Sequence, residues 1–108
     1  MIKNMKQQIE KLIKDSIDAK QKMLLPENVA EIENIAGKII NAYRSCKKMV
    51  TFGNGGSASD AAHFAGEMVS RFEKDRMALP AIAFTTNTAT ITSIGNDYSY
   101  ENIFSRQV

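Results

Sequence analysis

The sequence predicts a three-layer α/β/α fold, in which helices cover both faces of a parallel sheet, preceded by a pair of helices. Strand-like and helical segments alternate after residue 46, and this alternation favours parallel strands joined by helices. Before that point, two long stretches show the helical spacing of apolar residues without any strand pattern. The chain has 108 residues, which fits one domain or part of one.

Two amphipathic helices are expected at the N-terminal end. Apolar residues recur at spacings of three and four from Ile2 to Ile17, which predicts a helix with a narrow apolar stripe. Pro26 interrupts this pattern and suits the first turn of a second helix, which we expect to end near Ser45. Such a pair commonly packs as a helical hairpin, and a leading amphipathic helix often packs on another subunit. Residues 1–46 are therefore expected to serve oligomerisation.

Two short strands are expected, at residues 47–52 and 81–84. The first, KKMVTF, is a partly β-branched apolar run that ends at a glycine, and the second, AIAF, follows a proline. Helices are expected at about residues 58–72 and 89–94, followed by a turn at GNDYS and the start of another helix in YENIFSRQV. Because a doubly wound sheet usually has more strands, residues 47–108 are expected to be the first part of a longer domain.

The composition favours a cytoplasmic protein that binds neither nucleic acid nor a membrane. The formal net charge is only +2, so no strong field attracts polyanions. No segment approaches the roughly 20 apolar residues of a membrane span, and the N-terminus lacks the apolar core of a signal peptide. The single cysteine, Cys46, excludes an internal disulfide and fits a reducing compartment.

The stretch GNGGS, residues 53–57, joins the first expected strand to a helix. In open parallel sheets, ligands bind beyond the carboxyl ends of the strands. Glycines let a ligand approach the backbone, and the free N–H groups of a helix start favour an anion such as a sugar phosphate. We expect Ser57 to cap the helix and to present its hydroxyl outward. The pattern matches neither a dinucleotide fingerprint nor a Walker loop, and a simple tight turn is the competing interpretation.

His63 and Glu67 follow on the same expected helix, four residues apart, so their side chains point the same way. An imidazole and a carboxylate at this spacing can coordinate one divalent metal such as zinc. The glutamate can instead serve as the base for a carbon-bound proton. The alternative is an exposed polar pair on a surface helix. The helix starts at the glycine turn, and this position favours a functional role.

Three blocks in matching order resemble the phosphoheptose isomerases of the sugar isomerase (SIS) family: GNGGSASDAAHFAGEMVSRF, LPAIAFTTNTATITSIGNDY and ENIFSRQV. The resemblance implies a flavodoxin-like SIS fold, of which this chain holds the N-terminal part, and a homotetramer with active sites at subunit interfaces. It also implies zinc in the site. The implied reaction converts sedoheptulose 7-phosphate to D-glycero-D-manno-heptose 7-phosphate for bacterial lipopolysaccharide or capsule synthesis.

The resemblance assigns roles to individual residues. His63 and Glu67 match the first two zinc ligands of the family, and Glu67 also matches its catalytic acid/base. Substrate contacts are implied for the glycine turn, the GNDY block, the glutamate and an arginine after the helix: Asn54, Gly55, Gly56, Ser57, Glu67, Asn96, Asp97 and Arg71.

The family's remaining site residues, which include the late zinc ligands and a serine-rich phosphate loop, have no counterpart before Val108. The chain alone is therefore expected to be incomplete and inactive. A second class of function is also open, because SIS-fold proteins that bind a replication initiator resemble the isomerases. Those proteins lack the glutamate that is Glu67 here, so the sequence favours the enzyme.

Overall fold

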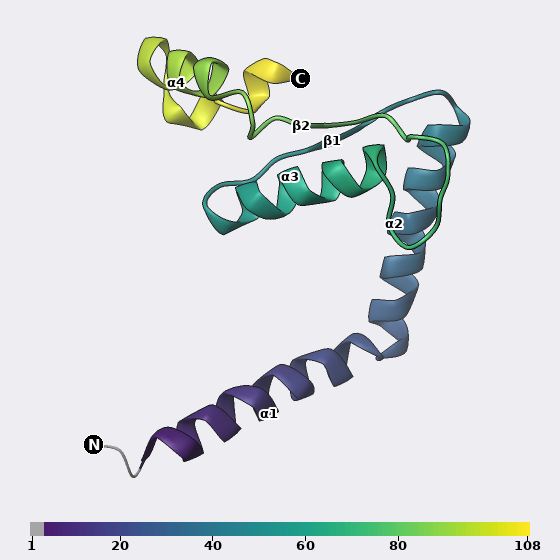
Figure 1. Cartoon of the computed structure of the whole chain (residues 1–108), viewed down its shortest axis with the longest axis vertical. Coiled ribbons are helices and arrows are strands. Elements are labelled where there is room, and N and C mark those ends of the chain that lie inside the picture. The colour runs from purple at the N-terminus through teal and green to yellow at the C-terminus, as the bar shows by residue number, and fades with distance from the viewer. Residues whose placement is uncertain (1–3) are drawn as a thin grey trace. The chain divides into compact units, whose positions relative to one another are not determined.

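The computed structural model describes residues 4–108, and the chain divides into two compact units between Ile40 and Asn41. The elements, labelled in Figure 1, are α1 (Met5–Met23), α2 (Pro26–Arg44), β1 (Met49–Thr51), α3 (Gly56–Val69), β2 (Ala81–Ala83), α4 (Thr88–Asp97) and two short 3₁₀ helices, η2 (Tyr100–Asn102) and η3 (Ser105–Gln107). This order confirms the expected helix pair followed by alternating strands and helices. In residues 4–108, no helix has the length and apolar character needed to cross a membrane.

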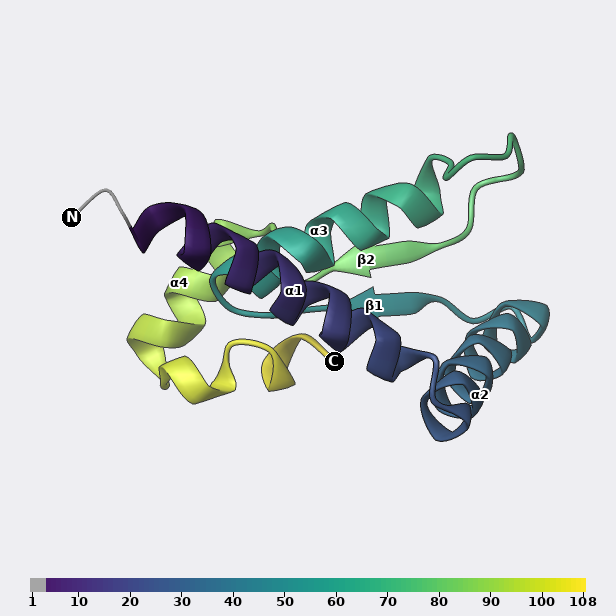
Figure 2. The same ribbon diagram turned by 90° about the horizontal axis from the view of Figure 1, so that it is seen from below.

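The first unit contains α1 and most of α2. Leu24 and Leu25 join the two helices in a short turn. Across this turn, the side chain of Asn28 in α2 donates to the carbonyl oxygen of Lys22 in α1 at 2.8 Å. The helices diverge from this turn, and they do not pack side by side along their lengths (Figures 1 and 2). The helix pair was predicted correctly, but its packing as a hairpin is not seen here. The apolar stripe of α1 is consequently between 50% and 68% exposed at Met5, Ile9, Leu12, Ile13 and Ile17.

The second unit is built on the pair of strands β1 and β2. The strands are parallel, as the sequence predicted, and Val50 lies opposite Ile82. Helix α3 follows β1 and helix α4 follows β2, so both helices begin at the edge where the strands end (Figure 2). This edge is where open parallel sheets bind their ligands.

Helix α3 packs on the strands through a face of small residues. Ala61 and Ala65 are buried, which lets the helix lie close to the sheet. The hydroxyl of Thr51, at the end of β1, donates to the carbonyl oxygen of Ala61 at 2.8 Å. The hydroxyl of Thr85, just after β2, donates to the carbonyl oxygen of Ala58 at 3.2 Å. These two contacts fix how far α3 is rotated and displaced along the strand ends, and they leave its opposite face exposed.

Two sequence predictions after β2 were wrong. Helix α4 begins close to the predicted position, where the Asn87 side chain accepts a hydrogen bond from the amide of Thr90, but it continues through most of GNDYS, which was predicted as a turn. The segment YENIFSRQV forms η2 and η3 and does not begin a regular helix. The side chain of Gln107 donates to the carbonyl oxygen of Phe84 at 3.2 Å, and Ile103 is buried. These tertiary contacts override the helical tendency of the segment.

Candidate sugar-phosphate site

The glycine turn between β1 and α3 depends on two glycines for different reasons. A Cβ atom on Gly53 would lie 2.7 Å from the carbonyl oxygen of Ser57, so only glycine fits against the first turn of α3. Gly55 has a φ of 58°, a backbone conformation that other residues rarely adopt. The amides of Gly55 and Gly56 have no backbone acceptor within residues 4–108. The turn therefore presents free N–H groups at the N-terminus of α3, which suits an anion.

Ser57 does not cap α3, in contrast to the sequence prediction. The helix begins at Gly56, with Gly55 at the cap position, because the positive φ of Gly55 lets the chain enter the helix earlier. The amide of Ser57 instead donates to the carbonyl oxygen of Asn54 at 3.1 Å. Ser57 is exposed, so its hydroxyl remains available in the first turn of α3.

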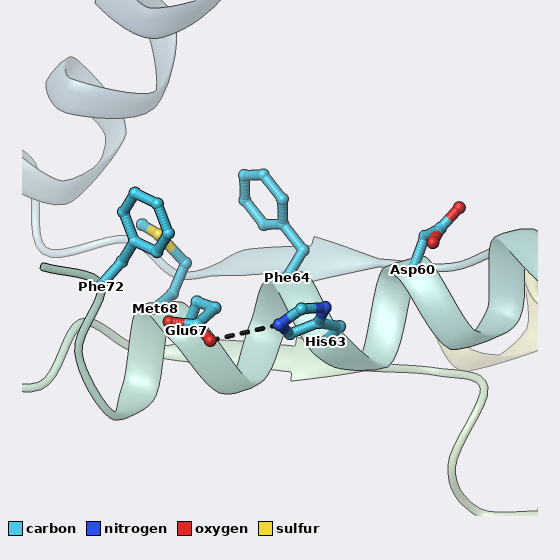
Figure 3. A pocket seen from close by; sticks show the side chains of 6 residues that line it. All are labelled: Asp60, His63, Phe64, Glu67, Met68 and Phe72. Atoms are coloured by element: carbon cyan, nitrogen blue, oxygen red, sulfur yellow. Dashed lines mark hydrogen bonds and ion pairs between the residues drawn. The ribbon is translucent and has the colours of Figure 1, made fainter. Parts of the chain in front are cut away.

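His63 and Glu67 form a pair on the face of α3 that points away from the sheet. Nε2 of His63 lies 3.2 Å from Oε1 of Glu67, and the two side chains lie side by side in Figure 3. The His63 side chain is 77% exposed, whereas that of Glu67 is 38% exposed. The carboxylate is thus the more sheltered member, and the imidazole is open to a ligand.

The pair lines a hollow of about 430 Å³ along the outer face of α3. The other lining residues are Asp60, Phe64, Met68 and Phe72. In Figure 3 the rings of Phe64 and Phe72 extend from α3 in a different direction from the His63–Glu67 pair. The two phenylalanines are 52% and 66% exposed. The hollow therefore combines the polar pair of His63 and Glu67 with an exposed apolar ridge formed by Phe64 and Phe72.

The other predicted contact residues lie at the edges of this region. The Asn54 side chain accepts a hydrogen bond from the hydroxyl of Tyr100 at 3.0 Å, a contact that ties the glycine turn to the segment after α4. Asn96 and Asp97 lie in the last turn of α4 and bond to each other at 2.9 Å, with no bond to the glycine turn in the described part of the chain. Arg71 follows the end of α3 and is exposed.

Two residues that hold the candidate site in place, Tyr100 and Arg76, were not predicted from the sequence. The guanidinium of Arg76 donates to the carbonyl oxygens of Glu67 and Met68, at 2.8 and 2.9 Å, and so holds the end of α3. A basic residue near a helix end is a known signal for this role. The signal was hidden because α3 was expected to continue to Phe72.

A turn with free N–H groups at the strand ends, followed by an exposed imidazole–carboxylate pair, is typical of α/β proteins that bind small anionic ligands. The particular family follows from comparison with known proteins. The chain belongs to the SIS-domain family, whose model matches residues 13–108.

Relatives of this chain are phosphoheptose isomerases. It is 55% identical over 105 residues to the phosphoheptose isomerase of Clostridium acetobutylicum, covering 96% of this chain and 54% of that protein. The solved phosphoheptose isomerase of Neisseria gonorrhoeae has a TM-score of 0.79 and 37% identity, covering 95% of this chain and 52% of that one. The corresponding structure from Francisella tularensis has the same TM-score and 35% identity, covering 94% and 53%.

These comparisons confirm the resemblance and the partial SIS fold predicted from the sequence. The chain spans about half the length of the curated relatives it matches.

Proposed function

We propose that this chain contributes the glycine turn and the acid/base pair of an aldose–ketose isomerase acting on sedoheptulose 7-phosphate. The observation that carries the proposal is the 3.2 Å pair of His63 and Glu67 on the helix that begins at the glycine turn. Both the relatives named above and the chemistry of this pair support it. The product is D-glycero-D-manno-heptose 7-phosphate, and we assign it to bacterial lipopolysaccharide or capsule synthesis in the cytoplasm.

Glu67 is the proposed acid/base. Aldose–ketose isomerisation removes a proton from one carbon and returns it to the adjacent carbon, through an enediolate, with no external oxidant or reductant. A positioned carboxylate can perform both transfers. The Glu67 side chain is partly sheltered, and His63 beside it limits the positions that the carboxylate adopts. This restriction supports a role for Glu67 in proton transfer.

The glycine turn is the proposed anchor for the substrate. Free amides at a helix N-terminus attract a phosphate or a sugar oxygen, and a hydroxyl or carboxamide nearby adds directional bonds. Gly55, Gly56, Ser57 and Asn54 offer these groups at the start of α3. Asn96, Asp97 and Arg71 are proposed to make further substrate contacts, and Arg71 is exposed enough to reach a ligand.

Zinc is the proposed cofactor, with His63 and Glu67 as two of its ligands. Two donors bound to one tetrahedral zinc lie about 3.3 Å apart, and Nε2 and Oε1 of this pair are 3.2 Å apart. The pair therefore fits half of a tetrahedral shell. Within residues 4–108, no group of three or more His, Cys, Asp or Glu side chains could hold a metal ion. Bound zinc would stabilise negative charge on a substrate oxygen.

Because this pair supplies only two of the four ligands of a tetrahedral zinc ion, the 108-residue chain is expected to bind zinc weakly. Calorimetric titration with zinc chloride should show weak binding that is lost in His63→Ala, because the imidazole is the stronger of the two donors present. Cys46→Ser should leave the binding unchanged and serves as the control for the exposed thiol. Tight stoichiometric binding, or binding that survives His63→Ala, would contradict the assignment.

A homotetramer with active sites at subunit interfaces is also proposed. The α1 stripe and the ridge of Phe64 and Phe72 expose apolar side chains that a second copy could cover.

The proposed function is tested by assaying the 108-residue chain and, where the gene encodes more, its complete product. Sedoheptulose 7-phosphate is supplied, and formation of the aldose phosphate is followed by chromatography or NMR. We expect the 108-residue chain alone to be inactive and the complete product to convert the substrate. A complete product that binds a replication initiator and lacks isomerase activity would establish the alternative class of SIS protein.

A further inference from the structure

The C-terminal end of α3 is held by a side chain that returns from the following loop. The helix ends at Val69, only two residues after Glu67, and the last carbonyl groups of a helix have no partner within it. Nη2 of Arg76 donates to the carbonyl oxygen of Glu67 at 2.8 Å, and Nη1 donates to that of Met68 at 2.9 Å. Nη1 also donates to the carbonyl oxygen of Met77 at 3.0 Å.

The surroundings of Arg76 distinguish it from the rest of this loop. Arg76 is half-buried, whereas residues 70–75 and 77–78 are exposed. The amide of Leu79 also donates to the carbonyl oxygen of Met68, at 3.0 Å. The loop is therefore fastened to the end of α3 by one guanidinium and one amide.

A guanidinium suits this position for two physical reasons. Its positive charge opposes the negative end of the helix dipole. Its planar fork can bond two adjacent carbonyls at once, which the single ammonium of lysine does less well. Opening the last turn of α3 requires both bonds to break, and the backbone of Glu67 lies in that turn.

We propose that Arg76 is a positioning residue, which keeps the carboxylate of Glu67 beside His63 by holding the last turn of α3. Both terminal nitrogens of Arg76 are bonded to main-chain carbonyls, so it acts through the helix and does not contact a substrate. Arg71 differs, because its side chain makes no hydrogen bond within residues 4–108, and it therefore remains available to a ligand. The kinetic consequence rests on the proposed isomerase function, whereas the structural consequence does not.

The structural test compares Arg76→Ala and Arg76→Lys with Lys74→Ala, an exposed cation on the same loop. Amide hydrogen exchange is measured for Ser70, whose N–H donates to the carbonyl oxygen of Gly66, and for Leu79. Arg76→Ala should accelerate exchange at both amides by at least about tenfold, because a hydrogen bond to a charged group shifts an opening equilibrium by that much. The ring signals of His63 should shift as well.

The variants separate a local role from a global one. Arg76→Lys should recover part of the protection, and Lys74→Ala should match the unaltered chain. Unchanged exchange and unchanged His63 signals in Arg76→Ala would overturn the proposal. Equal acceleration at every amide would also overturn the proposal, because the effect of Arg76 would then not be confined to the last turn of α3. Full protection in Arg76→Lys would overturn it too, because the two-pronged guanidinium would then not be needed.

The kinetic test uses the complete gene product. Arg76→Ala should lower kcat about tenfold while KM changes less than about twofold, because the base is misplaced and the substrate contacts remain. A change confined to KM would contradict a positioning role. Absence of activity in the unaltered product would count against the proposed isomerase, and the exchange measurements would then decide the role of Arg76 by themselves.

Discussion

Replacing Glu67 with glutamine is expected to lower kcat for the proposed isomerisation of sedoheptulose 7-phosphate by about 10²–10⁴-fold, the usual contribution of a positioned general base. Glutamine is nearly the same size and can still accept a hydrogen bond from His63, so the pair on α3 should persist. The amide cannot take a proton from carbon. The measurement is steady-state kinetics on the complete gene product, with circular dichroism and sizing to show an unchanged assembly.

Two further variants sharpen this prediction. Glu67→Asp keeps the carboxylate but withdraws it by one methylene, and a misplacement of about 1 Å can cost roughly 10²-fold. Its kcat should therefore fall between those of the unaltered enzyme and Glu67→Gln. Glu73→Gln removes an exposed carboxylate from the loop after α3 and should leave kcat unchanged. Substantial activity in Glu67→Gln would remove Glu67 from the proton-transfer step.

Features encoded by neighbouring residues could be predicted from the sequence. The two strands and the glycine turn followed from local composition, because β-branched runs and glycines act over a few positions. The parallel pairing followed from the alternation of strands and helices. The closeness of His63 and Glu67 followed from their spacing of four on a helix. The core of the candidate site is thus local in origin.

Features set by contacts between distant segments could not be predicted. Tyr100 bonds Asn54 across 46 positions, and no spacing rule links them. The end of α3 was placed too late, since Arg76 and Leu79 take up the carbonyl groups at residues 67 and 68. Ser57 was assigned the cap because the positive φ of Gly55 is not visible in the sequence. In each case a tertiary contact or a backbone angle decided the outcome.

Gly53→Ala is expected to destabilise the second unit by roughly 3 kcal/mol, at the upper end of the cost of overpacking. The added Cβ would lie 2.7 Å from the Ser57 carbonyl oxygen and 2.8 Å from its carbonyl carbon. These are backbone atoms in the first turn of α3, so no side-chain rotation can relieve the clash. Relief requires α3 to move away from β1, which would stretch the bond between Thr51 and the Ala61 carbonyl. Urea denaturation of the protein measures the loss.

Gly66→Ala is the matched control, because it adds the same methyl group at a glycine within α3, where the space is open. Nothing lies within 4 Å of the Cβ that would be added at Gly66, and alanine favours a helix over glycine by about 0.5–1 kcal/mol. This variant should therefore be slightly more stable than the unaltered chain. The opposite signs of the two effects would show that the Gly53 effect comes from close packing of the turn against α3. Equal stability of Gly53→Ala and the unaltered chain would mean that the turn can open without cost, which would remove the rigid anion-binding geometry on which the proposed substrate anchor depends.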